Sequence, residues 1–439
     1  MNPRSVLISG AGIAGPTLAF WLKAAGLQPT LVERALTLRS SGYVIDFWGL
    51  GYEIAERMGL ASEINRIGYH MRELRIVDCR GERVTGFGTS VFRESAGGRF
   101  VTLSRGDLSR LLFKKIKGTT DVLFGDEIVG LKEDASGVRV QFEHADERQF
   151  DLVIGADGLH SKVRELIFGP ENSFEKQLGY LVAAFEVRGY RPRNEDVYVI
   201  YSQPGRMLGR FALHGDRTLF LFVFTETERL SPVADLSAQK AILRERFNDG
   251  TWECPRILGE LDHTGDLYFD RVSQIKMDRW SRGRVALVGD AAFCVSLMAG
   301  QGSALAMIAA YVLAGELAKA RGNHDQALGK YQDILRTFIS SKQRGAEHFA
   351  NAFAPTTQWG LFLRNLVIRT LMVRGLARLT FGRDITDTMV LPEYHWPALR
   401  YYSPAPTSCS VFHSRCHGRL GPCVLKSGQH PSGKRTARV

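Results

Sequence analysis

The chain has 439 residues, of which 44% are hydrophobic, and this composition suits a soluble globular protein with two closely packed domains and a terminal extension. Its formal net charge is +11, but six of the 57 basic side chains and none of the 46 acidic ones lie after Ser403. The charge therefore favours a solvated basic tail over a nucleic-acid or lipid surface, although contact of the tail with either partner stays open.

The first thirty-five residues predict a βαβ unit. Ser5–Ser9 form a short apolar strand, and a glycine-rich turn follows it directly. Pro16–Ala25 have helical periodicity and end at Gly26, after which Thr30–Glu33 form the second strand. Because the first apolar stretch leads into a turn instead of a cleavage site, we expect no signal peptide and a cytoplasmic location.

The glycine-rich turn has the spacing of a dinucleotide-binding fingerprint. Gly10 permits the tight turn, Gly12 lets the backbone approach a pyrophosphate, and Gly15 allows close packing of helix against strand. The helix that follows presents free N–H groups and a positive dipole end to the phosphates. Glu33 lies eighteen residues beyond Gly15, where it can accept hydrogen bonds from ribose hydroxyls, and Arg34 can lie beside the adenine.

Two later strands also end in a small residue followed by an aspartate. Asp151–Ala156 are followed by Asp157, and Arg284–Gly289 by Asp290. Asp290 can bind a ribityl hydroxyl of a flavin cofactor. The N-terminus of the Ala-rich helix that comes next can stabilise negative charge on a reduced flavin.

The region from Gly179 to Phe269 differs in character, because its apolar residues alternate strongly. In the strand Thr218–Phe224 the phenylalanines share one face and the other apolar residues share the opposite face. Both faces are therefore covered, and one of them could line a ligand pocket, although core packing also explains such residues. Phe211 and Phe222 are the candidates for substrate contact from this region.

Helical patterns dominate the chain after this region. The predicted helices cover Ala304–Ala320, His324–Ala352 and Trp359–Arg378, and the last one carries four arginines on an apolar segment. We expect this last segment to be a surface helix that covers a core, with a helix resting on a membrane as the alternative. The longest apolar region, Val285–Leu317, contains acidic residues and glycines, so we expect a buried strand and helix and no transmembrane span.

After Trp396 the composition changes to Ser, Pro, Gly, Cys and basic residues, which predicts a disordered tail. Cys409, Cys416 and Cys423 recur near two histidines but form no CxxC pair, so we expect no metal site there. Six cysteines in a chain of this length also indicate no disulfide framework.

The glycine fingerprint, the run Gly155–Gly158 and the run Gly289–Ala292, taken in this order, resemble the three motifs of the para-hydroxybenzoate hydroxylase family of FAD monooxygenases. The resemblance covers roughly residues 5–320, and Asp270–Met277 and Gly289–Glu316 are most similar to the tetracycline-inactivating enzymes of that family. It implies an α/β fold, with a Rossmann-like (GR2-type) FAD-binding domain, an interleaved substrate domain built on a mixed sheet, and C-terminal helices. The implied bounds are 1–72, 102–176 and 268–320 for the FAD-binding domain, 73–101 and 177–267 for the substrate-binding domain, 321–396 for the helices and 397–439 for the tail.

The resemblance also implies which residues hold FAD. They belong to the glycine turn, the strand ends and two helix starts: Gly10, Gly12, Ile13, Ala14, Gly15, Glu33, Arg34, Arg105, Asp290, Gly302 and Ser303. Asp157 would serve both FAD and the nicotinamide donor. Since a second glycine fingerprint is absent from the sequence, NAD(P)H would visit transiently. O₂ would then form a flavin C4a-hydroperoxide that hydroxylates a bulky aromatic or polycyclic substrate. This chemistry needs no side-chain nucleophile or general base, and we expect no metal.

The chain departs from the family pattern at three places. Phe293 replaces a histidine, Ser296 and Leu297 stand where a proline is usual, and Ala304 replaces an asparagine. These changes could alter the contacts that the protein makes with the flavin ring, so a dehydrogenase or reductase without oxygen insertion is the alternative function. A flavin-bearing regulatory or nucleic-acid-associated protein that uses the tail is a third hypothesis.

Asp46 lies where the family's chain passes the flavin ring. Its carboxylate could orient the substrate or have a purely structural role.

Overall fold

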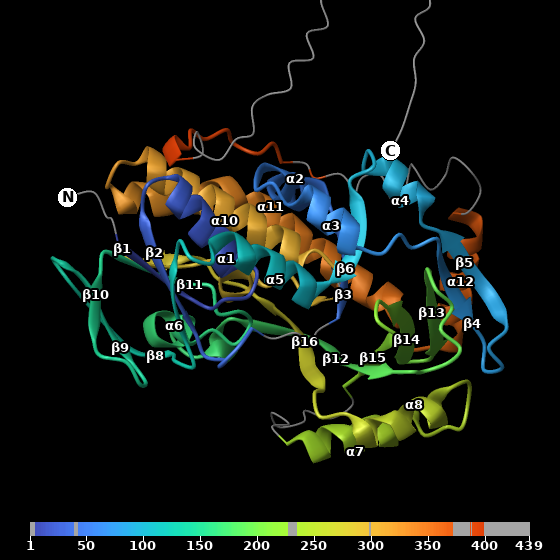
Figure 1. Cartoon of the computed structure of the whole chain (residues 1–439). Helices are drawn as coiled ribbons and strands as arrows, with labels where there is room; N and C mark the ends of the chain where they lie inside the picture. Colours follow the sequence, from blue (N-terminus) through green and yellow to red (C-terminus); the bar gives the residue numbers. More distant parts are fainter. Residues whose placement is uncertain are drawn as a thin grey trace, which may run out of the picture. The chain divides into compact units, whose positions relative to one another are not determined.

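In the computed structural model, a mostly parallel six-stranded sheet carries the glycine-rich turn (Figure 1). Its strands lie in the order β17, β18, β11, β1, β2 and β7, and β17 at one edge runs antiparallel to its neighbour. Their bounds in that order are Ser281–Arg282, Val285–Leu287, Leu152–Gly155, Ser5–Ser9, Gln28–Glu33 and Asp121–Phe124. The predicted βαβ unit is confirmed, because β1 and β2 pair in parallel and α1 (Ala14–Ala24) connects them.

The structure describes residues 5–38, 43–226, 235–297, 300–371, 387 and 389–398. All of them belong to one compact unit, 1–400, so the predicted division into an FAD-binding and a substrate-binding domain stays a prediction. Apart from residues 397 and 398, the predicted tail lies outside the described residues, and so do its cysteines and histidines.

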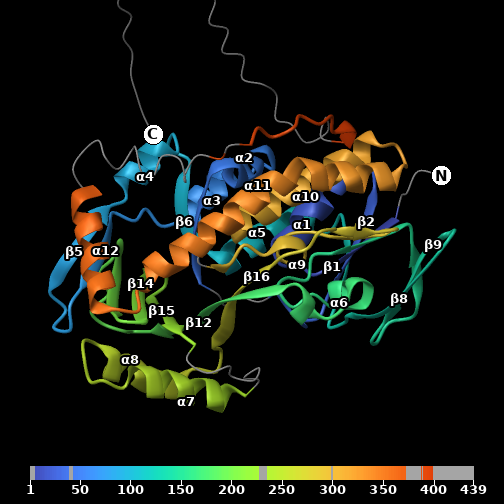
Figure 2. The ribbon, with the colours of Figure 1, turned by 180° about the vertical axis from the view of Figure 1, so that it is seen from behind.

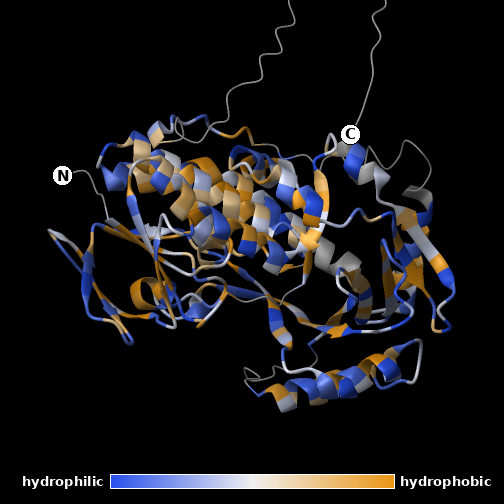
Figure 3. Ribbon diagram, in the orientation of Figure 1, coloured by the Kyte–Doolittle hydropathy of each residue, from blue (hydrophilic) through white to orange (hydrophobic). Residues whose placement is uncertain are grey.

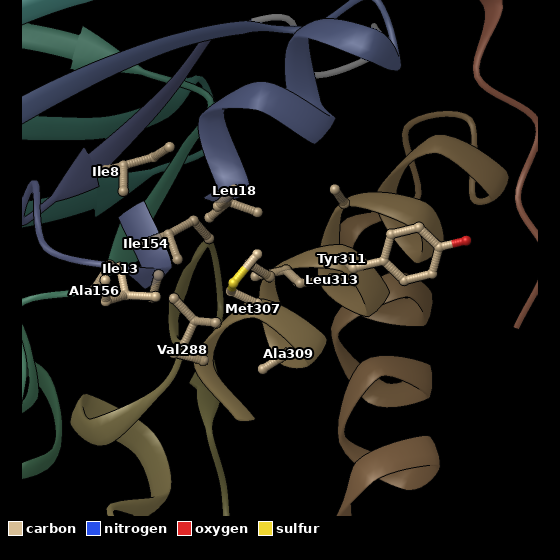
Figure 4. Packing of buried hydrophobic residues seen from close by; sticks show 14 of the residues in the cluster. Ile8, Ile13, Leu18, Ile154, Ala156, Val288, Met307, Ala309, Tyr311 and Leu313 are labelled. Carbon is tan, nitrogen blue, oxygen red and sulfur yellow. The ribbon is translucent and has the colours of Figure 1, made fainter. Parts of the chain in front are cut away.

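Helices α1, α5 (Arg105–Ile116), α10 (Gly302–Lys319) and α11 (His324–Phe353) pack beside this sheet (Figure 2). Their apolar side chains and those of the strands form one buried cluster, which includes Ile8, Leu18, Ile154 and Met307 (Figure 4). Figure 3 shows hydrophobic residues concentrated along α1 and α10. Among the described helices, α10 alone is long and apolar enough to cross a membrane, but 72% of it is buried inside the protein, as in a core helix.

A mixed seven-stranded sheet forms the second large element. Its strands lie in the order β16, β12, β15, β14, β13, β4 and β5, with β4 and β13 as a parallel pair among antiparallel ones. Their bounds in that order are Tyr268–Ile275, Glu175–Arg188, Arg217–Thr225, Arg206–Leu213, Val197–Gln203, Glu73–Val77 and Arg83–Gly88. The alternation predicted for residues 218–224 is confirmed, because β15 contributes its phenylalanines and its other apolar residues to different buried clusters.

Helices α7 (Leu236–Phe247) and α8 (Cys254–Glu260) cover the face of this sheet that carries the phenylalanines of β15 (Figure 1). Phe220, Phe222 and Phe224 are buried there together with Phe247 of α7 and Ile257 of α8. The opposite face carries Tyr180, Val182, Met207, Phe211, Leu219 and Val223. The two faces of the sheet therefore have separate apolar cores.

Two smaller groups of strands complete the sheet structure. The antiparallel pair of β3 (Val44–Trp48) and β6 (Phe100–Ser104) is one of them, and the antiparallel sheet of β8 (Ile128–Asp134), β9 (Gly137–Phe142) and β10 (Arg148–Phe150) is another. The remaining helices are α2 (Gly49–Arg57), α3 (Ala61–Ile67), α4 (Ser90–Ser95), α6 (Lys162–Phe168), η1 (Glu171–Ser173), η2 (Leu261–His263), α9 (Asp290–Phe293) and α12 (Gln358–Leu371). A Rossmann-like sheet, an interleaved mixed sheet and C-terminal helices confirm the predicted fold class.

Candidate functional site

The glycine turn between β1 and α1 is enclosed by backbone at two of its glycines. Gly10 has a φ of 103°, and a Cβ there would lie 2.5 Å from the carbonyl oxygen of Ala156. A Cβ on Gly15 would overlap the carbonyl oxygen of Gly10. At Gly12, by contrast, the nearest atom to an added Cβ is a guanidinium nitrogen of Arg105, 3.8 Å away. The space beside Gly12 is therefore open and bordered by a positive charge, which suits a pyrophosphate.

The start of α1 faces the same turn. Ile13 occupies the N-cap position and Ala14 the first helical position, and no side chain caps the helix. The backbone N–H groups of the first turn therefore lack a side-chain acceptor and could bind an anionic ligand. Both residues lie where the fingerprint predicts them.

Glu33 at the carboxyl end of β2 is oriented by backbone groups. Its two carboxylate oxygens accept hydrogen bonds from the N–H groups of Ala11, at 2.7 Å, and of Ala35, at 3.0 Å. The carboxylate is thus held against the glycine turn before any ligand binds, with lone pairs left for ribose hydroxyls. Arg34 has a largely exposed side chain, 4.0 Å from Glu127, so it could contact only the outer part of a ligand.

Arg105 begins α5 beside the glycine turn. Its backbone N–H donates to the carbonyl oxygen of Tyr43, and the hydroxyl of Ser109 one turn later donates to the carbonyl oxygen of Gly12. Burial raises the pKa of Tyr43 to about 12, and the positive charge of Arg105 opposes that rise. The guanidinium thus lies close enough to Gly12 and Tyr43 to join the two sides of the site.

Asp290 begins α9 and faces the N-terminus of α10. A Cβ on Gly302 would lie 3.7 Å from a carboxylate oxygen of Asp290, and Ser303 is buried in the first turn of α10. Burial raises the pKa of Asp290, while the charge of Arg105 and a hydrogen bond with Cys294 lower it. The glycine turn, Arg105 and Asp290 therefore meet in one place, at the carboxyl ends of the parallel strands, as the motifs predict.

Asp157 follows β11, and its carboxylate is hydrogen-bonded within the protein. It accepts hydrogen bonds from the Ser161 hydroxyl and from the Val163 N–H at 3.1 Å, at the start of α6. Burial raises its pKa and these two hydrogen bonds lower it. Arg164, which is fully buried, follows in the same helix and donates to the carbonyl oxygen of Ala291 beside Asp290. These contacts join the loop after β11 to the start of α6 and to the residue after Asp290.

Asp46 lies between the pair β3–β6 and the seven-stranded sheet. One of its carboxylate oxygens accepts hydrogen bonds from the Thr102 hydroxyl and, at 3.3 Å, from the Tyr198 hydroxyl. The other oxygen accepts no hydrogen bond from the described residues. Burial raises the pKa of Asp46, and the two hydrogen bonds lower it. The ring of Phe211 lies 4.6 Å from that of Tyr198, so Phe211 and Asp46 belong to the same side of the sheet.

Phe222 lies on the other side of the sheet, which corrects its prediction as a substrate contact. Its fully buried ring packs edge-on against Phe247 of α7, with ring centres 4.9 Å apart, and stacks on Phe185. The alternation of the strand separates its two faces but does not say which one a later helix covers. In this fold α7 and α8 cover the phenylalanine face, so Phe222 is a core residue.

Two of the departures from the family pattern have packing explanations. Phe293 is buried against Trp280, with ring centres 4.6 Å apart. A Cβ on Gly51 of α2 would lie 2.5 Å from the Cβ of Ala304, so α2 and α10 approach closely at this point. Phe293 therefore belongs to the protein core, and Ala304 lies where α2 and α10 come closest.

Sequence reasoning missed several residues that surround Asp290 and Asp46. Tyr43 and Tyr268 have ring centres 5.6 Å apart, and burial raises the pKa of the Tyr268 hydroxyl well above its usual value. Cys294 is buried and its thiol contacts Asp290, although the sequence shows it only as an isolated cysteine. Its position four residues after Asp290 was the one available signal. No group of His, Cys, Asp and Glu among the described residues has the arrangement of a metal site.

The FAD binding domain family model matches residues 4–340. The uncharacterised protein Rv1260 of Mycobacterium tuberculosis is 37% identical over 357 residues, which cover 77% of this chain and 92% of that protein. A flavin-dependent monooxygenase of Legionella longbeachae is 33% identical over 355 residues, which cover 77% of this chain and 87% of that enzyme. The tetracycline destructase Tet(51), whose crystal structure is known, is 30% identical in sequence to this chain. The match covers 90% of this chain and all of that protein, with a TM-score of 0.77.

Proposed function

The chain belongs to the family of FAD-dependent monooxygenases, and from this membership we propose that it uses NAD(P)H and O₂ to hydroxylate a bulky aromatic or polycyclic small molecule. The family assignment makes it a flavoprotein and an oxidoreductase. The single observation that carries the proposal is the meeting of Gly12, Arg105 and Asp290 in one site.

The described residues fit FAD. The open space beside Gly12, next to the guanidinium of Arg105, would take the pyrophosphate, and the uncapped start of α1 at Ile13 and Ala14 would add N–H donors. Glu33 would accept hydrogen bonds from the ribose, with Arg34 beside the adenine. Asp290, Gly302 and Ser303 would face the ribityl chain and the flavin ring. Gly10 and Gly15 would shape the turn, and Asp157 would belong to the motif that serves both FAD and the nicotinamide donor.

Bound FAD, once reduced by NAD(P)H, supplies the electrons that activate O₂. The side chains of this protein bind and orient the substrate and exclude water from the site. The apolar face of the seven-stranded sheet that carries Phe211 would exclude water from the substrate. Asp46 would accept a hydrogen bond from a donor group of the substrate through its second carboxylate oxygen, while Thr102 and Tyr198 hold the first. No side chain needs to act as a nucleophile.

In this proposal residues 1–72, 102–176 and 268–320 bind FAD, and residues 73–101 and 177–267 contribute the substrate side. The alternative function, a dehydrogenase or reductase without oxygen insertion, was suggested by Phe293 and Ala304. The packing of Phe293 against Trp280 and of Ala304 against Gly51 explains both residues without a change in chemistry. These two residues therefore give no separate reason to prefer the reductase, and the family membership favours the hydroxylase.

The proposal is tested with purified holoenzyme, NADPH or NADH, and isotopically labelled O₂, supplied with a panel of phenols, anthraquinones and other polycyclic compounds. A product that contains one labelled oxygen atom, with matching consumption of the nicotinamide, is the expected result. Nicotinamide oxidation that proceeds without O₂ when a quinone or dye acceptor is present, and no labelled product from any member of the panel, would establish the reductase instead.

A further inference from the structure

Two buried glutamines from different elements donate hydrogen bonds to one loop of the candidate FAD site. Gln274 of β16 is fully buried, and Gln343 of α11 is 8% exposed. The side-chain amide of Gln343 donates to the carbonyl oxygen of Cys294, and that of Gln274 to the carbonyl oxygen of Val295, both at 3.1 Å. Both carbonyl groups belong to the loop 294–297, which follows α9 and borders the site close to Asp290.

Each amide also binds the element that carries the other glutamine. Gln274 donates to the backbone carbonyl oxygen of Gln343, and Gln343 donates to that of Ile275, both at 2.8 Å. The backbone N–H of Ile275 in turn donates to the carbonyl oxygen of Cys294 at 3.0 Å. Gln274 and Gln343, called the glutamine pair below, therefore join β16, α11 and the loop 294–297 to one another.

The glutamine pair is used for its N–H donors. The Oε1 atom of Gln274 is buried and accepts no hydrogen bond from the described residues. A buried acceptor without a partner costs free energy, so its presence in a native structure needs a reason. An aliphatic side chain at residue 274 would avoid that cost, but the carbonyl groups of Val295 and Gln343 would then lose this donor. The donors are therefore what the glutamine supplies.

The loop that the glutamine pair holds is strained at its next residue. Ser296 is buried and has a φ of 99°, which residues other than glycine rarely adopt. Such a conformation persists only where the surrounding structure enforces it. A proline at residue 296 would be held at about −65°, so this form of the loop is open to serine and closed to proline. The glutamine pair fixes the two residues directly before Ser296.

Cys294 connects this strained loop to the candidate FAD site. Its buried thiol contacts the carboxylate of Asp290, accepts a hydrogen bond from the backbone N–H of Ser296, and lies 3.6 Å from the carbonyl oxygen of Ser273. The Asp290 carboxylate also faces Gly302, where α10 begins. A change in the loop would therefore reach the place proposed for the ribityl chain and the flavin ring.

We propose that Gln274 and Gln343 are positioning residues for the flavin, because they hold the loop 294–297 in its strained form and so keep Asp290 and the start of α10 in place against the cofactor. The proposal rests on the placement of FAD beside Asp290 that the proposed function includes. The start of α10 would stabilise negative charge on the reduced flavin. The glutamine pair therefore affects both the affinity for FAD and its reduction potential.

The test compares Gln343→Met and Gln274→Met with wild-type, full-length protein loaded with FAD. Methionine keeps the length of the side chain and removes its N–H donors. We expect the dissociation constant for FAD to rise about tenfold in both variants, the visible absorption bands of bound FAD to shift, and the reduction potential to fall. None of these measurements uses substrate or O₂, so they are independent of whether the enzyme inserts oxygen.

Gln332→Met is the matched control. Gln332 belongs to the same helix, accepts a hydrogen bond from the backbone N–H of Trp280 and donates to the carbonyl oxygen of Asp278, both at 2.9 Å. Its side chain thus also makes two hydrogen bonds with the backbone, but outside the loop 294–297. This variant should lower the thermal midpoint and leave the affinity, the spectrum and the reduction potential of bound FAD as in the wild type.

A second substitution at residue 296 tests the link between the glutamine pair and the strain. Glycine adopts a positive φ without strain, so Ser296→Gly in the Gln343→Met background should recover most of the lost affinity for FAD. If Gln343→Met does not fold, Gln274→Met is combined with Ser296→Gly in its place. A folded Gln343→Met or Gln274→Met protein with the affinity and spectrum of the wild type overturns the proposal. The same holds for a Gln332→Met protein with an equal change in the spectrum, and for a double variant without recovery.

Discussion

The guanidinium of Arg164 donates a hydrogen bond of 3.0 Å to the carbonyl oxygen of Ala291. The same side chain donates to the carbonyl oxygen of Leu159 at 2.6 Å and pairs with Glu171 at 2.7 Å. Arg164 is fully buried. One side chain therefore joins the loop after Asp157 to the residue after Asp290, which keeps the two aspartate motifs at a fixed separation.

Replacement of Arg164 by Met should lower the free energy of unfolding by about 2–4 kcal/mol, because two buried carbonyl oxygens lose their donor and Glu171 loses its partner. Chemical denaturation of the apoprotein measures this change, and FAD titration should show weaker binding. Lys162→Met, in the same helix, removes an exposed pair with Glu165 and should change stability by no more than about 0.5 kcal/mol. Equal effects of the two substitutions would contradict the bridging role of Arg164.

Gly12→Ala should separate folding from cofactor binding. A methyl group at residue 12 meets only the end of the Arg105 side chain, at 3.8 Å, so the apoprotein should fold with an unchanged thermal midpoint. The same methyl group occupies the space proposed for the pyrophosphate, and the dissociation constant for FAD should rise by about 100-fold or more. Gly15→Ala should fail to fold, whereas Gly259→Ala, which meets no atom within 4 Å, should behave as wild type.

Glu33→Ala should weaken FAD binding by about 10- to 100-fold, as expected for the loss of one or two hydrogen bonds to a charged acceptor. The Ala11 N–H would also lose its partner. Fluorescence titration of the apoprotein with FAD measures the affinity. Glu147→Gln, at an exposed carboxylate, is the control, and an affinity of Glu33→Ala within twofold of this control would exclude the ribose contact.

Asp46→Asn should affect substrate binding and stability in opposite directions. Burial raises the pKa of Asp46, so the folded protein favours its protonated form. The contribution of this group to stability is therefore greatest at low pH and is lost as pH rises through the raised pKa. At neutral pH the Asn variant, which removes a buried charge, should be as stable as the wild type or more stable. Its KM for substrates with a hydroxyl donor should rise about tenfold.

The pH dependence of that KM provides a separate check. In the wild type, KM for a phenol should increase as Asp46 becomes protonated at a pH above the usual range of aspartate. Methyl ethers of the same phenols lack the donor hydrogen, so their KM should not change with pH in this range. A phenol and its ether with the same pH profile would argue against a contact with Asp46.

His160 should make stability depend on pH in the alkaline range. Hydrogen bonds to Asp270 and Glu171 raise its pKa to about 10. The resulting stabilisation is present below the unfolded-state pKa of about 6.5 and is lost as pH rises through about 10. The ring is 62% exposed, so solvent keeps the effect under about 1 kcal/mol. The difference in Tm between the wild type and His160→Gln should be largest near pH 6 and disappear near pH 10.

The parts of the fold that the sequence predicts correctly are those with local causes. The strand, turn and helix around Gly10 follow from hydrophobic periodicity and from the needs of a tight turn, so their order and pairing could be predicted. The start of helix α1 was predicted two residues too late, at Pro16, because a proline is also tolerated within the first turn of a helix. The alternation of β15 was also predictable, since side chains on a strand alternate whatever packs against them.

The remaining features depend on residues far apart in the chain. Phe222 packs against Phe247, which no pattern within β15 reveals. Asp157 carries a motif signal, but its hydrogen bonds to Ser161 and Val163 appear only in the folded loop. The sequence could identify Asp46 as an acidic residue near the site. It could not identify its partners Thr102 and Tyr198, because they come from two other strands.

The two cores of the seven-stranded sheet also bear on how such an enzyme could acquire new substrates. Phe220, Phe222 and Phe224 anchor the sheet to α7 and α8, while Phe211 and Leu219 lie on the opposite side. Substitutions at residues that share no partners tend to have additive effects on stability. A mutant library restricted to the Phe211 side would therefore change the side of the sheet proposed for the substrate and leave the contacts of Phe220, Phe222 and Phe224 with α7 and α8 unchanged.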